Sequence, residues 1–383
     1  MADPRPSGTR LRLALIGAGT ISQSVHLPAL RRLSTEIELI AVCDASPSRA
    51  EAVARREGAR GEHDAERLLE REDLDAVLLA TPGSHGQLAR QALLAGRHVL
   101  AEKPLTLTVA EAEELAALAA DRGLVLQVGY MKMYDPLIAE ARDQLERIGV
   151  PRLVRITVLH PADEQQLAHL RMAPLADDSD PHTIAAAHAY DTRRTELAVG
   201  SAQSPLAVWY RDVLHGSVIH ELSLLRALGL GLPERFEQVR VWPWPPDGAP
   251  PCLLASASLA EGRRLLLSWN WLPAYPEYEE EVVVLGTAGR VRLQVAPPYL
   301  FEARSRLEID HRDRGLHAAT RVRTAHVSGF SVQLEAFLAS VRGGAQVLSD
   351  ARGAAADTRC LQRLAASAAA DQGDAPLGGE AGA

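Results

Sequence analysis

The stretch LALIGAGTIS, residues 13–22, decides the fold of this chain. Its four apolar residues lead directly into a Gly-x-Gly turn, and the residues after the turn suit the start of a helix. A side chain would block the tight turn at Gly17 and the approach of a pyrophosphate at Gly19. The helix start at Thr20 and Ile21 would offer free N–H groups to that anion. The stretch therefore predicts a buried strand, a phosphate-binding turn and a helix.

An acidic residue follows the second apolar run. The run AVCD ends at Asp44, roughly 20 or more residues past the glycines, where a dinucleotide-binding domain places the adenosine ribose. The Asp44 carboxylate can accept hydrogen bonds from the ribose hydroxyls and would repel a 2′-phosphate, so NAD is favoured over NADP. The alternative is that Asp44 only caps the next helix.

Short apolar runs alternate with amphipathic stretches throughout residues 11–128. Continuous β-rich runs separated by helical segments are typical of parallel strands covered on both faces. The predicted strands are LRLALIG, IELIAVCD, LDAVLLATP, GRHVLAEKP and GLVLQVGY, and the predicted helices cover residues 26–33, 48–57, 65–70, 86–94 and 109–121. The fold class is therefore α/β, with an N-terminal Rossmann domain on a doubly wound parallel sheet.

The pattern changes after residue 128. We interpret the polar residues 160–209 as a long, partly ordered insertion, and the apolar runs between residues 236 and 295 as an antiparallel sheet. Residues 129–370 should thus form an α+β domain on a large, mostly antiparallel open sheet. Further predicted elements are helices over 135–148, 333–341 and 358–370, a strand over 153–160, a flexible N-terminus over 1–10 and a disordered tail over 371–383.

Size, charge and cysteine content narrow the class of protein. A chain of 383 residues exceeds what one core usually organises, and a net charge of −8 leaves no basic excess for nucleic acid or an anionic membrane. Cys43, Cys252 and Cys360 lie far apart and form neither a disulfide nor a metal-binding pattern. No apolar run approaches the length of about 20 residues that a membrane-spanning helix needs. We therefore expect a soluble, cytoplasmic, two-domain protein without a metal, nucleic-acid or membrane partner.

Six stretches resemble the glucose-fructose oxidoreductase, inositol dehydrogenase and rhizopine catabolism (Gfo/Idh/MocA) family. They are GAGTISQSVHLPAL, AVCDASPSRAEAVA, TPGSHGQLARQALLAGRHVLAEKPLTLTVAEAEEL, GYMKMYDP, VIHELSLLRALG and GFSVQLEAFLASVRGG, and they follow the family's order over most of the chain. The resemblance implies a nicotinamide ring at the junction of the two domains and hydride transfer to or from a sugar, amino sugar or cyclitol. It also implies a homodimer or homotetramer formed through the C-terminal sheet.

The motif Glu102-Lys103-Pro104 lies at the C-terminal end of a predicted strand, the edge where open α/β sheets bind ligands. Lys103 can give or take the proton that accompanies hydride transfer if partial burial lowers its pKa; the alternative is an ordinary surface Lys-Pro turn. The resemblance also makes Thr81, Pro82, His85 and Glu102 neighbours of the cofactor. His85 could otherwise cap the helix that follows it.

The second-domain segment VIHELSLLRALG contains His220, to which the resemblance gives a substrate-binding or proton-relaying role opposite Lys103. The alternative is a satisfied core histidine on a helix with one buried face. Many relatives carry an aspartate four residues before this histidine, whereas this chain has Gly216. His215 or Asp212 could compensate, although neither would point in the same direction from a helix.

Two residues of GYMKMYDP, Tyr130 and Lys132, lie where relatives often have a side chain that reaches the substrate, although a structural role fits them equally well. Glu279, Glu280 and Glu281 look instead like the solvated start of a strand.

The leading functional prediction is an NAD-dependent dehydrogenase or reductase of a sugar-like substrate, with Lys103 and His220 as its catalytic residues. Gly216 and the insertion suggest an alternative, a reductase of an imine or a non-sugar carbonyl in a biosynthetic pathway. A third possibility is a cofactor-binding protein that has lost catalysis.

Overall fold

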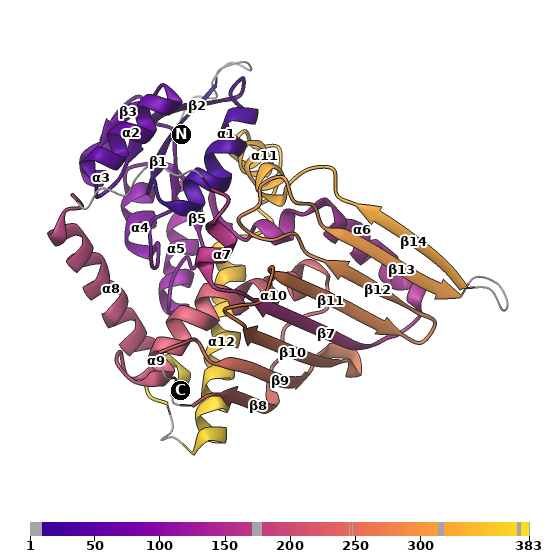
Figure 1. Ribbon diagram of the computed structural model, residues 1–383. Coiled ribbons are helices and arrows are strands. Elements are labelled where there is room, and N and C mark those ends of the chain that lie inside the picture. Colours follow the sequence, from indigo (N-terminus) through magenta and orange to yellow (C-terminus); the bar gives the residue numbers. More distant parts are fainter. Residues whose placement is uncertain are drawn as a thin grey trace.

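A computed structural model describes residues 10–382, apart from residues 171–177, 245, 247, 313–317 and 374–376. Two domains lie side by side, one around a parallel sheet and the other around a larger sheet (Figure 1). The predicted flexible N-terminus lies outside the described residues, except for Arg10. Within the described part, no helix combines the length and the apolar character that crossing a membrane requires.

The N-terminal domain confirms the predicted doubly wound parallel sheet. Its strands lie in the order β3-β2-β1-β4-β5-β6, so the order reverses between β1 and β4. The strands are β1 (Leu11–Ile16), β2 (Ile37–Cys43), β3 (Arg60–Glu62), β4 (Ala76–Leu79), β5 (His98–Glu102) and β6 (Leu126–Gly129), of which the sequence patterns miss only β3. The helices are α1 (Leu27–Arg32), α2 (Pro47–Glu57), α3 (Ala65–Leu69), α4 (Gly86–Leu94) and α5 (Val109–Arg122).

Alternate residues of the central strands enter two apolar cores, one on each face of the sheet. Leu13 belongs to one core and Ala14 to the other, which explains why β1 is a continuous apolar run. Phe337 of α11 (Gly329–Val341) completes the first core beside α1. A second late helix, α12 (Ala351–Gln372), packs on α5. The end of the chain therefore returns to cover the N-terminal domain.

The C-terminal domain confirms the predicted large, mostly antiparallel sheet. Its strand order is β14-β13-β12-β11-β7-β10-β9-β8, and β7 with β10 is the one parallel pair among the described strands of this sheet. The strands are β7 (Pro151–His160), β8 (Phe236–Trp242), β9 (Cys252–Ser258), β10 (Arg264–Trp271), β11 (Glu279–Gly286), β12 (Gly289–Gln294), β13 (Arg306–Arg312) and β14 (Ala318–Thr324). The sequence patterns miss β13 and β14.

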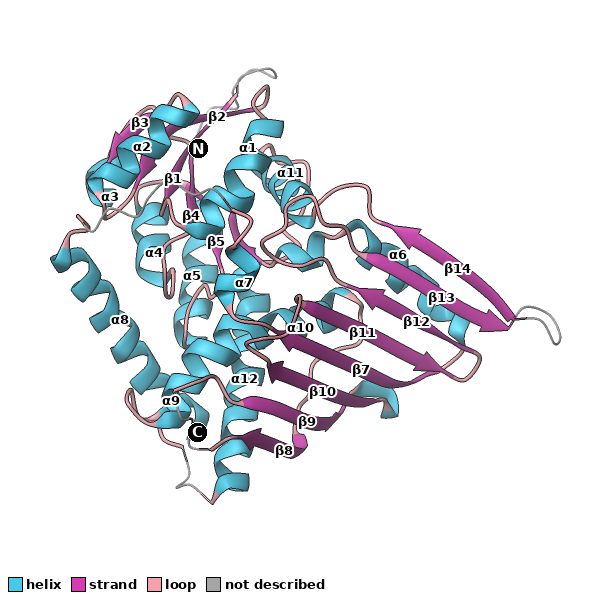
Figure 2. Ribbon diagram, viewed as in Figure 1, coloured by secondary structure: helices cyan, strands magenta, loops and turns pink. Residues whose placement is uncertain are grey.

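Helices cover one face of this sheet. Figure 2 shows α6 (Pro136–Gln144), α10 (Ile219–Ala227) and α12 gathered behind it. The other face carries Leu254 and Leu266 with 47% and 40% of their surface exposed.

Two segments differ from the prediction. The expected insertion contains the helices α7 (Asp163–Leu167), α8 (Pro181–Val199) and α9 (Pro205–Trp209), followed by the π-helical turn η4 (Tyr210–Val218). Its polar pattern conceals α8 because that helix buries only Thr195, Ala198 and Val199.

The predicted tail is also ordered over its described residues. Residues 371 and 372 end α12, and η6 (Gly379–Gly382) lies against α8. Glu380 accepts hydrogen bonds from the amides of Val109 (2.8 Å) and Ala110 (3.0 Å), and so caps the start of α5, where the Thr108 side chain makes no capping hydrogen bond.

Candidate active site

The glycine turn has the geometry of a phosphate cradle. Gly17 has φ +96°, and a Cβ there would lie 2.5 Å from the backbone of Ala80, so only glycine fits. A Cβ on Gly19 would meet no atom within 4 Å, which leaves open space before the helix that starts at Thr20. Ser22, in the π turn η1 (Ser22–His26), donates to the Gly17 carbonyl at 2.5 Å and holds helix and turn together. These residues fit a dinucleotide pyrophosphate.

Asp44 lies beside this turn at the end of β2. Its Oδ2 accepts from the Ala18 amide at 2.8 Å, and its Oδ1 accepts from the Ser46 amide at 2.9 Å. Arg49 lies 3.2 Å from Oδ1 and balances part of the charge. The structure thus brings the predicted ribose-binding carboxylate next to the predicted phosphate cradle.

The loops after β4 and β5 meet at the same edge. The backbone nitrogen of Thr81 would lie 2.7 Å from a Cβ on Gly17, and Pro82 follows Thr81. His85 is buried, and its Nδ1 lies 2.9 Å from the Pro104 carbonyl. Burial lowers the pKa of His85. His85 therefore stabilises the segment around Lys103 through its contact with the Pro104 carbonyl.

Glu102 is held by a histidine from η1. His26 Nε2 donates to Glu102 Oε1 at 2.8 Å, and the Lys103 amide donates to Oε2 at 3.1 Å. Burial alone would raise the pKa of Glu102, but the hydrogen bond from His26 and the nearby positive charges lower it. Glu102 is thus a fixed carboxylate directly beside the lysine.

Lys103 reaches from the Rossmann edge to the second domain. Its half-buried Nζ donates a hydrogen bond to the carbonyl oxygen of Gly216 in η4, and the Lys103–Pro104 peptide is cis. Burial lowers the pKa of Lys103, while the charge of Glu102 acts in the opposite direction. The predicted proton carrier therefore combines a fixed position with a pKa closer to neutrality than that of a free lysine.

Three predicted pocket residues lie deep in the interior. His220 is buried with its ring 6.4 Å from that of Tyr130, and burial, aided by the charges of Lys132 and Lys103, holds the pKa of His220 well below its usual range. His215 is fully buried against Tyr210, and burial lowers its pKa to about 3. Both imidazoles are therefore neutral at physiological pH.

Neither His215 nor Asp212 takes the place of the aspartate that is missing at position 216. His215 packs inward on Tyr210, and Asp212 pairs with Arg211 at the surface. Tyr130 likewise lies inside the protein, 5.9 Å below the guanidinium of Arg226.

Lys132 is the centre of a buried charge cluster. Its Nζ donates to Glu280 and lies 3.4 Å from Glu221, and the Tyr278 hydroxyl donates to Glu280 at 2.6 Å. The interpretation of Glu280 as solvated is wrong, since only 3% of it is exposed. The alternation of β11 places Glu280 on the inner face with Val282 and Val284, and that period of two was the available signal.

The pKa values of Lys132 and Glu221 are both raised, which favours the charged form of the lysine and the neutral form of the glutamic acid. Burial alone would lower the pKa of Lys132, but Glu280 and Glu221 raise it. Burial raises the pKa of Glu221, although Lys132 acts against this. The ammonium of Lys132 therefore pairs with Glu280 and lies beside a readily protonated Glu221, directly next to His220.

An aromatic group that the sequence analysis missed also borders the site. His160 and Trp271 are opposite each other where the parallel strands β7 and β10 end, with ring centroids 5.3 Å apart. Trp269 Nε1 donates to Ser217 Oγ at 2.8 Å, next to Gly216. The charges of Lys132 and Lys103 contribute to a lowered pKa of His160, after the larger effect of burial. The alternating aromatic residues of SWNW were the signal for this wall.

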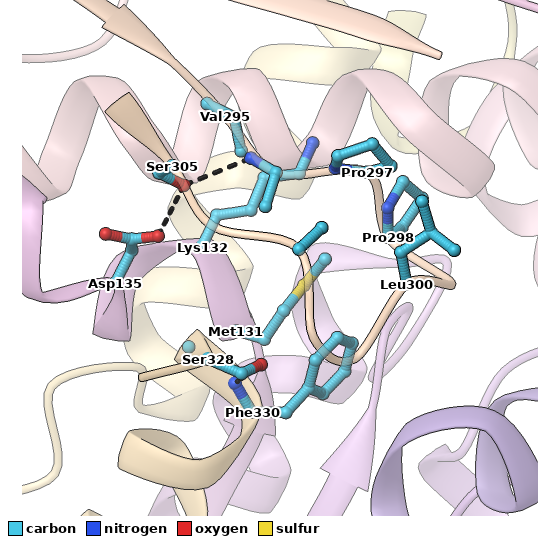
Figure 3. Close-up of a pocket in the computed structure, with 13 residues that line it drawn as sticks. Met131, Lys132, Asp135, Val295, Pro297, Pro298, Leu300, Ser305, Ser328 and Phe330 are labelled. Atoms are coloured by element: carbon cyan, nitrogen blue, oxygen red, sulfur yellow. Dashed lines mark hydrogen bonds between the residues drawn. The ribbon is translucent and has the colours of Figure 1, made fainter. Parts of the chain in front are cut away.

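A small pocket of about 30 Å³ lies behind Lys132 (Figure 3). The Ser305 hydroxyl links its walls, because it donates to Asp135 Oδ2 at 2.6 Å and accepts from the Ala296 amide at 3.0 Å. Its volume suits about one water, so we assign it no substrate. Among the residues that the structure describes, no three His, Cys, Asp or Glu side chains are grouped to hold a metal ion.

Comparison with known proteins matches the N-terminal domain most strongly. Residues 11–130 match a family model described as "Oxidoreductase family, NAD-binding Rossmann fold". Inositol 2-dehydrogenase 4 of Saccharopolyspora erythraea is 42% identical over 158 residues, which cover 39% of this chain and 45% of that protein. A dTDP-3,4-didehydro-2,6-dideoxy-α-D-glucose 3-reductase of Saccharopolyspora spinosa is 33% identical over 150 residues, again 39% and 45% of the two chains. The chain thus spans less than half the length of these curated relatives.

Solved structures resemble the whole fold. A 3-ketoreductase from Actinomadura kijaniata, in complex with NADP and TDP-benzene, superimposes with a TM-score of 0.69 at 22% identity, covering 94% of this chain and 98% of that one. The two-domain architecture is therefore shared over nearly the full length.

Proposed function

We infer, from the membership of its N-terminal domain in the Gfo/Idh/MocA family of NAD-binding oxidoreductases, that this protein transfers hydride between a nicotinamide cofactor and the hydroxyl/ketone pair of a sugar, amino sugar or cyclitol. The observation that carries the proposal is the fixed amino group of Lys103 at the carboxyl edge of the Rossmann sheet. Inositol dehydrogenation and dTDP-sugar 3-ketone reduction, the activities named for the two relatives, belong to this chemistry.

The residues of the Rossmann edge have separate roles in holding the dinucleotide. Gly17, Gly19 and the helix start at Thr20 and Ile21 would bind the pyrophosphate, and Asp44 would bind the adenosine ribose. Thr81, Pro82 and Glu102 would border the nicotinamide half. The nicotinamide, when bound, supplies or accepts the hydride.

The proton is handled by Lys103. Its Nζ would donate a proton to the developing alkoxide during reduction and accept one from the hydroxyl during oxidation. The Gly216 carbonyl fixes the amino group through a hydrogen bond, and the charge of Glu102 favours its protonated form. His220, kept neutral by burial, would orient a substrate hydroxyl through its ring nitrogens. Alignment of the donor and acceptor carbons supplies much of the acceleration.

NADH should bind more tightly than NADPH, because the Asp44 carboxylate suits ribose hydroxyls and repels a 2′-phosphate. Titration of the protein's tryptophan fluorescence with each reduced dinucleotide measures both dissociation constants. Equal or tighter binding of NADPH contradicts the assignment of Asp44.

Oxidation should depend on pH through Lys103. Only the neutral amine can accept the proton, so the oxidation rate should rise with pH through the lowered pKa of Lys103 and level off above it, whereas reduction should fall over the same range. Gly216→Asp should shift the rise of the oxidation rate to higher pH by about one unit, because a nearby carboxylate favours the ammonium form of Lys103. The space beside Gly216 accepts a Cβ without contact.

The matched control is Gly216→Asn, which has the same shape as the Asp variant without the charge and should leave the pH of this rise unchanged. The measurement is kcat/KM against pH for both variants. If the Asp and Asn variants give the same profile, the ionising group is not Lys103.

A second candidate function is the reduction of an imine or another non-sugar carbonyl. The aromatic wall of His160, Trp269 and Trp271 favours it, because flat apolar surface suits substrates with fewer hydroxyls than a polyol. A steady-state screen of polyols against carbonyl and imine substrates separates the two functions. Tight NADH binding without turnover of any of them would favour a catalytically silent protein.

We also propose a homodimer or homotetramer formed through the C-terminal sheet. Support comes from the exposed Leu254 and Leu266 on its open face. Three free cysteines, Cys43, Cys252 and Cys360, support a cytoplasmic location.

A further inference from the structure

A segment of the second domain returns to the ribose end of the nucleotide site. Asp178 Oδ1 accepts from the Ser46 hydroxyl, and Oδ2 accepts from the Ser48 amide at 3.0 Å. The Asp180 amide donates to the Ala45 carbonyl at 2.9 Å. These contacts join residues about 130 positions apart, so they place a carboxylate from outside the Rossmann fold immediately after Asp44.

The donors that Asp178 occupies are those that a 2′-phosphate would need. Ser46 caps α2, and the Ser48 amide belongs to the first turn of that helix. Free amides and hydroxyls at the start of a helix bind anions, and this helix starts directly beside the ribose-binding carboxylate. The nearby cation, Arg49, is engaged by Asp44 at 3.2 Å. The Asp178 carboxylate therefore occupies the place of the phosphate with a charge of the same sign.

The segment is fixed at a second point, on the neighbouring Rossmann loop. Asp191 of α8 accepts from the Ser84 hydroxyl at 2.5 Å and from the Ser84 amide at 3.1 Å. A Cβ on Gly83 would collide with the Asp191 carboxylate, so the loop closely follows the helix. Between the two attachments, residues 181–189 are exposed. Figure 1 shows α8 running along the outside of the molecule. The helix thus spans the ribose end from β2 to β4 and holds Asp178 in position.

We propose that Asp178 is a specificity-determining residue that excludes NADP by filling the 2′-phosphate position with its own carboxylate. This inference rests on the proposed nicotinamide-dependent function. Asp44 and Asp178 place two carboxylates beside one arginine, Arg49, so an added phosphate would meet net negative charge. It would also find the Ser46 hydroxyl and the Ser48 amide already bound to Asp178. The hydrogen bonds from Ser46 and Ser48 lower the pKa of Asp178, which keeps it ionised at physiological pH.

The test compares NADH and NADPH affinities of the full chain and of Asp178→Asn, measured by fluorescence titration. The asparagine has the same size but no charge. Its single oxygen can still accept from the Ser48 amide, and its NH2 group can donate to the Ser46 hydroxyl oxygen. NADPH affinity should rise about tenfold or more, while NADH affinity should change less than about threefold. The matched control is Asp180→Asn, which caps α8 in the same segment but contacts neither serine, and it should keep the wild-type ratio.

The outcomes are distinct. An unchanged NADPH:NADH ratio in Asp178→Asn overturns the inference, and so does an equal loss of both affinities, which would mean that Asp178 only tethers the segment. A wild-type protein that binds neither dinucleotide overturns the proposed function and this inference together. The proposed function and the inference are both supported if the wild-type protein prefers NADH, Asp178→Asn reduces this preference and Asp180→Asn keeps it.

Discussion

Replacing Lys103 by methionine should reduce kcat by ~10² to 10⁴-fold, the usual contribution of general acid/base catalysis. Methionine keeps most of the apolar stem and removes the ammonium that donates to the Gly216 carbonyl. Since the lysine acts on charge that develops during the reaction, the loss should appear mainly in kcat and only slightly in KM. Steady-state kinetics with a polyol or ketose that the parent protein converts measures both constants.

Two measurements show whether the effect is chemical. NADH affinity and thermal stability of Lys103→Met should stay near those of the parent, because the glycine turn and Asp44 are untouched. His220→Ala should instead weaken substrate binding as well as slow the reaction. A kcat close to the parental value in Lys103→Met would mean that the proton moves through another group, and His220 or His215 would be the next candidates.

Replacing Lys132 by methionine should lower the free energy of unfolding by about 3 to 5 kcal/mol, the usual cost of removing one partner from a buried ion pair. Lys132 and Glu280 have almost no exposure, and Glu221 is fully buried, so water cannot replace the lost ammonium. At least one carboxyl group would have to be protonated, and the other would remain uncompensated. Equilibrium urea unfolding measures the loss.

A double variant and a surface control define the cause. Lys132→Met/Glu280→Met removes a charge of each sign and should recover part of the loss. Arg55→Met, which breaks an exposed i,i+4 pair with Glu51, should change stability by less than about 0.5 kcal/mol. A Lys132→Met protein as stable as the Arg55→Met protein would show that the cluster is reached by water.

Local patterns were sufficient to predict the elements that bury a regular face. The limits of α4, residues 86–94, follow from its apolar spacing, and β11 follows from its apolar run and the glycines of the next turn. β13 escapes the same reasoning because its polar positions are charged and pair across the open face, as Asp310 does with Arg290. A strand with so many charged side chains, next to the edge strand β14, resembles a solvated loop in the sequence.

The parts of the site that the sequence predicts lie on one continuous motif or one strand end. Asp44 and Lys103 both follow apolar runs, so their position at the sheet edge could be derived. The Lys132 cluster could not be derived, because its two acidic partners come from α10 and β11, about 90 and 150 residues away. The approach of Asp178 to the ribose end likewise depends on tertiary packing, which leaves no local periodicity in the sequence.

The atom that holds the amino group of Lys103 belongs to the main chain. Every residue type has a carbonyl oxygen, so an alanine scan or a saturation library across η4 leaves this anchor in place, and aligned sequences cannot reveal it. Substitutions at position 216 therefore change the side chain beside the carbonyl oxygen but leave the hydrogen bond from Lys103 in place. Only a change to the backbone itself, such as an ester in place of the amide after Gly216, would weaken the oxygen as an acceptor. The wide π-helical turn thus provides a functional group that side-chain genetics does not detect.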